Sequence, residues 1–146
     1  MLFNKIVVPI DFSEHSDKAL DWALRLAQHA GTPVVLCHVI PRLPIEWMGQ
    51  TTVEEHKIGE GLREEAEKRL QALAVGKTVP IHSLVVYGGV PAMEICRVAE
   101  QKQADLIVMG TQGRTGISHL LMGSVAERVV RHAPCAVLTV CVPSQA

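Results

Sequence analysis

Five short apolar runs divide the chain, and none of them alternates polar with apolar positions. They are rich in valine, isoleucine and leucine, which is typical of strands covered on both faces. The runs span residues 5–10, 33–40, 81–87, 105–110 and 135–142. We therefore expect five buried β-strands.

Four segments between these runs carry apolar residues at the 3.6-residue spacing of a helix. The first helix has Ser13 or Ser16 as its cap and ends at Gly31. The second extends from about Val53 to Val75. Its expected buried stripe consists of Leu62, Ala66, Leu70 and Leu73. The charged residues between these positions then form a solvated helix face.

The third helix opens at Pro91, because proline is favoured in a first turn. The fourth begins at Ser124 and stops before Pro134. The residues expected to be buried are Ala92, Ile95, Val98 and Ala99 in the third helix and Val125, Val129 and Val130 in the fourth. This alternation of strand and helix predicts an α/β fold, a Rossmann-like open parallel five-stranded sheet with helices on both faces.

Two strand orders fit this alternation. In the order 3-2-1-4-5, the first and fourth strands are neighbours, so Asp11 after the first strand faces the loop that begins at Gly110. A flavodoxin-like order of 2-1-3-4-5 instead places Gly88 and Gly89 opposite Asp11. The loop after the fourth strand is richer in glycine, which favours the order 3-2-1-4-5.

Composition narrows the classes of partner. The chain has 146 residues, a net charge of −1 and 3% aromatic residues. We expect one domain over residues 1–146, with neither a basic surface for nucleic acid nor a platform for stacked bases. No apolar run approaches the roughly 18 residues of a membrane span, and no secretory segment follows the N-terminus. These features predict a cytoplasmic protein without membrane insertion.

The cysteines carry no sign of a metal site. The four of them, Cys37, Cys96, Cys135 and Cys141, lie in apolar segments without C-x-x-C or metal-ligand spacing. We expect buried free thiols, because reduced cysteine behaves as a small apolar residue.

The richest candidate for binding chemistry is the glycine loop after the fourth strand. Glycines in such a loop allow positive φ and close approach of backbone N–H groups to an anion. Gly123 and Ser124 then open a helix whose free N–H groups and dipole favour phosphate. A purely structural interpretation is also open, because Ser124 and Glu127 have the spacing of a capping box.

The spacing of the loop glycines resembles a known pattern. Gly110, Gly113, Gly123 and Ser124 match the G-x2-G-x9-G-[S/T] motif of the ATP-binding universal stress proteins. The opening segment 6–13, the segment 37–40, the turn 88–91 and the helix entry 121–126 are similar to that family in the same order. The resemblance therefore covers the whole chain.

The resemblance implies a bound adenine nucleotide, ATP, AMP or ADP, with accompanying Mg²⁺ left open. It implies that Asp11 accepts from the ribose hydroxyls and that the backbone of Val39 reads the adenine edge. The other implied site residues are Pro9, Ile10 and Met109 as apolar walls, Gly110 and Gly113 along ribose and phosphates, and Gly123, Ser124, Val125 and Ala126 as phosphate donors. Arg114 is a further phosphate contact or, equally, a solvated loop side chain.

The resemblance also implies a homodimer. The last strand is an edge in the expected order, and a long apolar edge pairs readily with another strand. The expected pairing segment begins at Ala136 and ends at Val142. The alternative is that residues 143–146 cover this edge.

Residues 41–52, which contain two prolines, are expected to form a mobile flap of open function.

The residues argue for binding rather than catalysis. The chain has no P-loop motif and no G-x-G-x-x-G turn, so we expect slow hydrolysis at most and no catalytic residue. His119 is the histidine we expect nearest to phosphate. The leading hypothesis is a nucleotide-dependent stress or regulatory protein with an unidentified protein partner.

Three alternatives stay open. An adenylyltransferase or ATP pyrophosphatase would carry H-x-G-H or S-G-G-x-D-S near the first helix, and residues 11–16 resemble neither. A receiver-like phosphoacceptor would need an acidic cluster beside Asp11 and a lysine after the last strand, and both are missing from the sequence. A family member that binds no nucleotide would act only as an interaction module.

Overall fold

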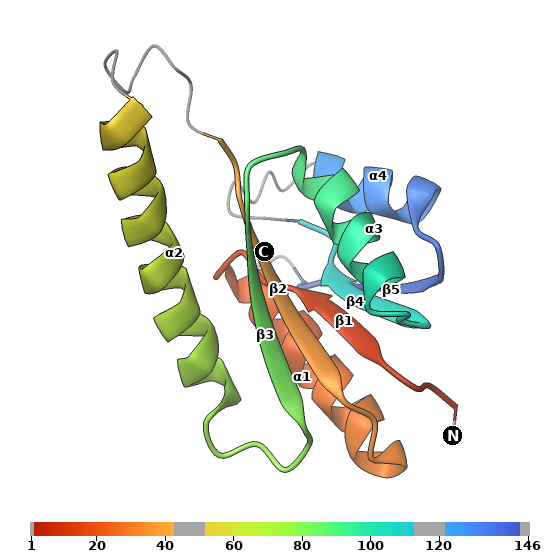
Figure 1. Ribbon diagram of the computed structural model, residues 1–146. Coiled ribbons are helices and arrows are strands. Elements are labelled where there is room, and N and C mark those ends of the chain that lie inside the picture. Colours follow the sequence, from red (N-terminus) through yellow and green to blue (C-terminus); the bar gives the residue numbers. More distant parts are fainter. Residues whose placement is uncertain (1, 43–51, 113–121, 144–146) are drawn as a thin grey trace.

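The sheet is fully parallel and has the order β3-β2-β1-β4-β5 (Figure 1). The computed structural model describes residues 2–42, 52–112 and 122–143. Its strands are β1 (Ile6–Pro9), β2 (Val34–Ile40), β3 (Ile81–Tyr87), β4 (Leu106–Gly110) and β5 (Ala136–Val140). The predicted order 3-2-1-4-5 is therefore confirmed, and the flavodoxin-like order is excluded.

The helices form one layer on each face of this sheet (Figure 1). They are α1 (Glu14–Ala30), α2 (Thr52–Ala74), α3 (Pro91–Gln101) and α4 (Ser124–His132). Ile6 and Val8 of β1 pack in the core beneath α1 and α2, whereas Val7 packs in the core beneath α3 and α4. Because both faces of β1 are covered, its successive residues Ile6, Val7 and Val8 are all apolar.

Local signals in the sequence set the ends of α1 and α3. The Ser13 hydroxyl accepts from the Ser16 N–H at 3.2 Å, so Ser13 rather than Ser16 caps α1. Gly31 closes the same helix at φ 64°, a left-handed conformation that favours glycine. Pro91 is the first residue of α3.

Several burial predictions need correction. Leu62 on α2 is 39% exposed, because the helix packs on the sheet through Ala66 and Leu70. On α4, the buried stripe is Ala126 and Val129. The residues Val125 and Val130, which were expected to be buried, are instead 36% and 48% exposed.

The cysteines are all free, but they are not all buried. Cys37 and Cys96 are buried, Cys135 is half-buried and Cys141 is exposed, because it follows the last residue of β5.

Among the described residues, no group of three or more His, Cys, Asp or Glu side chains is placed to hold a metal ion. No helix in the same part of the chain is long and apolar enough to cross a membrane.

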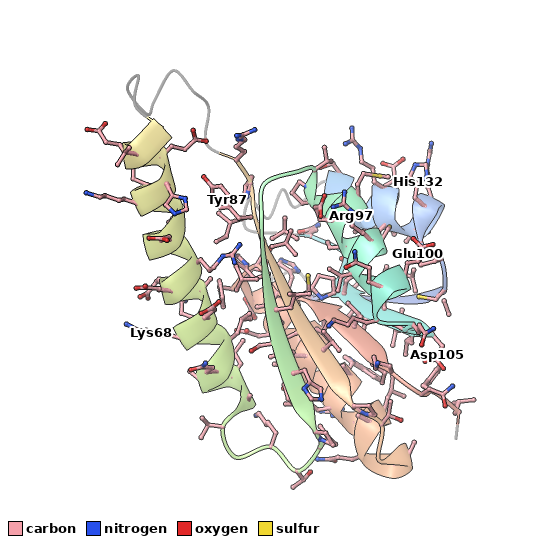
Figure 2. The ribbon with its side chains drawn as sticks, viewed as in Figure 1. Lys68, Tyr87, Arg97, Glu100, Asp105 and His132 are labelled. Carbon is pink, nitrogen blue, oxygen red and sulfur yellow. The ribbon has the colours of Figure 1, made fainter. Side chains whose placement is uncertain are left out.

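Asp105, next to β4, ties this strand to the segment before β1 (Figure 2). Its carboxylate accepts from the backbone N–H groups of Asn4 at 2.8 Å and Lys5 at 3.2 Å. Burial raises the pKa of the Asp105 carboxyl, but these hydrogen bonds outweigh burial and lower the pKa overall.

We expect Asp105→Ala to lower the free energy of unfolding at pH 7 by about 1 kcal/mol, a value discounted for solvent screening. Because the folded pKa is depressed, this stabilisation is present above the unfolded pKa and disappears as pH falls through the folded pKa. Urea denaturation at neutral and acidic pH measures both effects. Equal stability of variant and wild type at pH 7 would contradict this role.

Candidate functional site

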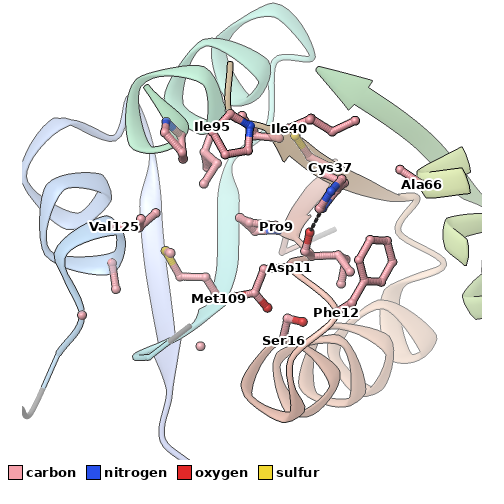
Figure 3. A pocket seen from close by; sticks show the side chains of 18 of the residues that line it. Pro9, Asp11, Phe12, Ser16, Cys37, Ile40, Ala66, Ile95, Met109 and Val125 are labelled. Atoms are coloured by element: carbon pink, nitrogen blue, oxygen red, sulfur yellow. Dashed lines mark hydrogen bonds between the residues drawn. The ribbon is translucent and has the colours of Figure 1, made fainter. Parts of the chain in front are cut away.

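A cavity of about 480 Å³ opens at the carboxyl ends of the parallel strands. It lies where β1 and β4 are neighbours and the chain winds outward in opposite directions. Ligands of open parallel sheets bind at this switch point. The cavity is lined mainly by apolar side chains, with Asp11 among the few charged ones (Figure 3).

Ten of the twelve predicted site residues line this one cavity. They are Pro9, Ile10, Asp11, Val39, Met109, Gly110, Gly123, Ser124, Val125 and Ala126. Gly113 and Arg114, together with His119 and most of the expected flap, lie outside the described residues.

The turn between β1 and α1 holds Asp11 at the cavity. Oδ1 of Asp11 accepts from the backbone N–H of Ser13 at 3.0 Å and from the Ser13 hydroxyl at 2.5 Å. Between them, Phe12 adopts φ 63°, in the left-handed region. For a bulky side chain this conformation costs about 1–2 kcal/mol, and such strain concentrates at functional sites. Neighbouring contacts must stabilise it.

Two side chains contact the Phe12 ring. The Arg69 guanidinium carbon, on α2, lies 3.8 Å from the ring centroid. The His38 ring, on β2, lies 4.7 Å away between centroids at an interplanar angle of 44°. Nδ1 of His38 is 2.6 Å from the Ile10 carbonyl oxygen, so Nδ1–H donates there (dashed in Figure 3).

The N-terminus of α4 opens onto the same cavity without a side-chain cap in the described part of the chain. Its cap residue is Gly123, at φ −71° and ψ 163°, and Ser124 is the first helical residue. Glu127 instead forms an ion pair with Arg131 at 3.0 Å. The capping-box interpretation is therefore wrong, because Ser124 lies inside the helix.

The first backbone bond of α4 runs from the Glu127 N–H to the Gly123 carbonyl at 3.0 Å. The N–H groups of Ser124, Val125 and Ala126 precede this ladder, and all three residues line the cavity. The N–H groups of a first helical turn and the positive end of the helix dipole favour a bound anion at this position.

The two loop glycines that the structure describes do not adopt positive φ. Gly110 and Gly123 both lie outside the left-handed region, so that expectation is wrong for them. A Cβ at Gly110 would lie 2.8 Å from Cβ of His15 and 3.0 Å from its carbonyl carbon. The first motif glycine therefore lets α1 pack directly on the end of β4.

Helix α2 contributes a cavity wall that the sequence analysis missed. Leu62, Glu65, Ala66 and Arg69 line the cavity from this helix. Two of them belong to the predicted apolar stripe of α2, and their spacing of three and four residues places the four on one face. The stripe was visible in the sequence, but the cavity beside it was not.

Cys37 adds no reactive group to the cavity wall. Burial, with a smaller contribution from the nearby Glu94 carboxylate, raises the pKa of the Cys37 thiol to about 12. The thiol is therefore protonated near neutral pH and acts as an apolar wall residue.

Comparison with known proteins assigns this architecture to a family. The sequence profile of the universal stress protein family matches residues 2–140. The chain belongs to the universal stress protein family. Universal stress protein MJ0531 of Methanocaldococcus jannaschii is 40% identical over 147 residues, which covers 99% of this chain and 85% of the relative.

Solved structures of the family share the fold. The structure of MJ0577, from the same archaeon, superposes with a TM-score of 0.87 at 28% identity and covers 99% of this chain and 100% of its own. A universal stress protein from Archaeoglobus fulgidus, solved in complex with dAMP, superposes with a TM-score of 0.66 at 25% identity. That alignment covers 95% of this chain and 98% of the other.

Proposed function

We propose that this chain is a single-domain, cytoplasmic, nucleotide-binding universal stress protein of the G-x2-G-x9-G-[S/T] subgroup. In this proposal the cavity holds ATP, AMP or ADP, with or without accompanying Mg²⁺. The protein is a regulatory homodimer with slow or no ATP hydrolysis, and it acts on a protein partner.

The uncapped N-terminus of α4 is the observation that carries this proposal. Three consecutive residues, Ser124, Val125 and Ala126, line the cavity, and their backbone N–H groups precede the first described hydrogen bond of the helix, where phosphate binds favourably. Most of the other side chains that line the cavity are apolar, which suits a planar base. A relative that was solved with dAMP supports the same ligand class.

Asp11 tests the ribose end of this site. We expect Asp11→Ala to weaken ATP and adenosine alike, by about 10-fold to 100-fold, because a carboxylate that accepts two hydroxyls contributes about 1.5–3 kcal/mol. Calorimetric titration of both ligands measures the two losses. Asp21→Ala, on the exposed face of α1, is the matched control and should bind as the wild type does. Equal affinities of Asp11→Ala and wild type would remove Asp11 from the site.

Binding without rapid hydrolysis follows from the groups that the sequence offers. Phosphoryl transfer needs a positioned cation and a residue that orients water. The chain has no P-loop lysine, and in this proposal the first turn of α4 supplies backbone donors instead. Such donors hold a nucleotide. The bound nucleotide can then regulate the dimer or a protein partner only if the affinity of that interaction differs between nucleotide states.

The edge position of β5 supports dimerisation through the predicted segment 136–142. The Thr111 N–H donates to the Val140 carbonyl at 3.1 Å, so the backbone of Val140 faces β4. Because successive residues alternate, the backbone groups of Thr139 face the open edge.

We expect Thr139→Pro to produce a monomer, since proline removes the outward N–H without interrupting the ladder to β4. Sedimentation velocity measures the change of mass. Thr139→Val, which keeps the backbone donor, should remain dimeric. A monomeric wild type, or a dimeric Thr139→Pro variant, would exclude pairing through this edge.

A further inference from the structure

We propose that Arg69 is a positioning residue for the nucleotide site. Its guanidinium, stacked on Phe12, holds the left-handed turn that directs Asp11 into the cavity. The inference rests on the proposed function, because it assigns Arg69 an effect on the ribose end of that same site. In this inference, helix α2 contributes to the orientation of Asp11 before the ligand binds.

The strained turn depends on Phe12. This residue stands between Asp11, which accepts the hydrogen bonds, and Ser13, which donates both of them and caps α1. Its φ of 63° brings Ser13 back towards the Asp11 carboxylate. A relaxed backbone at Phe12 would separate these two groups and change the direction of the carboxylate.

Arg69 is well placed to hold the ring. Its neighbour Leu70 is fully buried, and Ala66, one turn earlier, is 4% exposed, so the backbone of α2 is fixed to the sheet at this level. From this anchored turn the guanidinium reaches the Phe12 ring at 3.8 Å. Figure 3 shows the Phe12 ring on the side of the cavity that faces Ala66 and α2.

The ring is held from a second element as well. His38 of β2 contacts it, and Nδ1 of His38 is itself fixed by the Ile10 carbonyl. The Phe12 conformation is therefore determined by contacts to α2 and β2, neither of which adjoins it in sequence. A local strain of this kind persists where the surrounding structure over-determines it.

Amide hydrogen exchange tests this link without any nucleotide. The Ser13 N–H reports the turn, because Asp11 accepts from it, whereas the Ile10 N–H reports the sheet through its 2.8 Å bond to Cys37. We expect Arg69→Ala to accelerate exchange at Ser13 by about tenfold and to leave Ile10 unchanged. Unchanged exchange at Ser13 would overturn the proposal.

Lys68→Ala is the matched control, because Lys68 is adjacent on α2, carries the same charge and points away from the sheet (Figure 2). It should leave both amides unchanged, and an equal acceleration at Ser13 would overturn the proposal. A second experiment, in a chain that carries Phe12→Gly, tests whether Arg69 acts through the Phe12 ring. In Phe12→Gly, where glycine adopts positive φ without strain, Arg69→Ala should have no further effect on Ser13. A further acceleration there would show that Arg69 acts through another contact.

Titration then relates the turn to the ligand. We expect Arg69→Ala to weaken ATP and adenosine by the same factor, about threefold to tenfold, and to have no further effect in an Asp11→Asn chain. A larger loss for ATP, or a full loss in the Asp11→Asn chain, would make Arg69 a direct ligand contact and overturn the positioning role. If the wild type binds no nucleotide, the proposed function fails, whereas the exchange experiment still decides the link between Arg69 and Asp11.

Discussion

Gly123→Val should reduce ATP affinity at least about 100-fold, which corresponds to about 2.7 kcal/mol. Gly123 is the cap residue of α4 and lines the cavity beside the N–H groups of the first helical turn. A branched side chain at this point would occupy the space through which phosphate oxygens reach those groups. The backbone itself, at φ −71° and ψ 163°, accepts valine without strain, so the fold should persist.

Gly61→Val is the control for this substitution. Gly61 lies on α2, and a Cβ there meets no atom within 4 Å, so the same change is made away from the cavity. We expect this variant to bind ATP as the wild type does. Calorimetry measures both affinities, and circular dichroism and sedimentation verify fold and dimer. Wild-type affinity in Gly123→Val would remove the entry of α4 from the binding site.

Gly110→Ala should destabilise the protein by about 2 kcal/mol, in the range of other overpacked sites. The new methyl group would lie 2.8 Å from Cβ of His15 and 3.0 Å from its carbonyl carbon and oxygen. Two of these atoms belong to the backbone of α1, so the contact cannot be relieved by rotating a side chain. Either α1 or β4 must shift. Urea denaturation measures the loss.

Gly61→Ala provides a control of opposite sign. Alanine in an open helical position should stabilise the chain by about 0.5–1 kcal/mol. A stability of Gly110→Ala equal to that of the wild type would show that α1 does not pack on β4 as closely as described. The two motif glycines thus have different expected phenotypes, loss of stability at Gly110 and loss of ligand at Gly123.

The strand order was predictable because two regularities agreed. A chain in which apolar strand segments and helical segments follow one another in turn can form few topologies. The position of the glycine loop favoured one of the two strand orders that remained. The ends of α1 followed from Ser13 and Gly31, whose side chain and conformational freedom act locally. The two ends of α1 could therefore be predicted from the chemistry of single residues.

The site was predictable only in part. The resemblance indicated residues from β1, β2, β4 and α4, and those within the described chain line one cavity. It did not indicate α2, because the angle of that helix over the sheet is a tertiary property. No sequence signal identified the left-handed Phe12, since that conformation is favoured by glycine, asparagine or aspartate rather than by phenylalanine.

The capping-box interpretation at Ser124 failed because the spacing of two residues does not fix where the helix begins. The Ser-x-x-Glu spacing is correct, but the helix begins one residue earlier than the motif requires, with Gly123 at the cap. Glu127 then pairs with Arg131, one turn further along α4. A single-residue shift in helix start thus leaves the α4 N–H groups available for an anion.

Calorimetric titration of nucleotide-stripped protein with Mg·ATP measures directly whether the cavity holds a nucleotide. We expect saturable binding with a stoichiometry near one nucleotide per chain. Absence of binding heat across several temperatures, together with an unchanged melting temperature at saturating Mg·ATP, would contradict it. The cavity at the switch point would then hold no nucleotide, and the chain would act as an interaction module of the same fold.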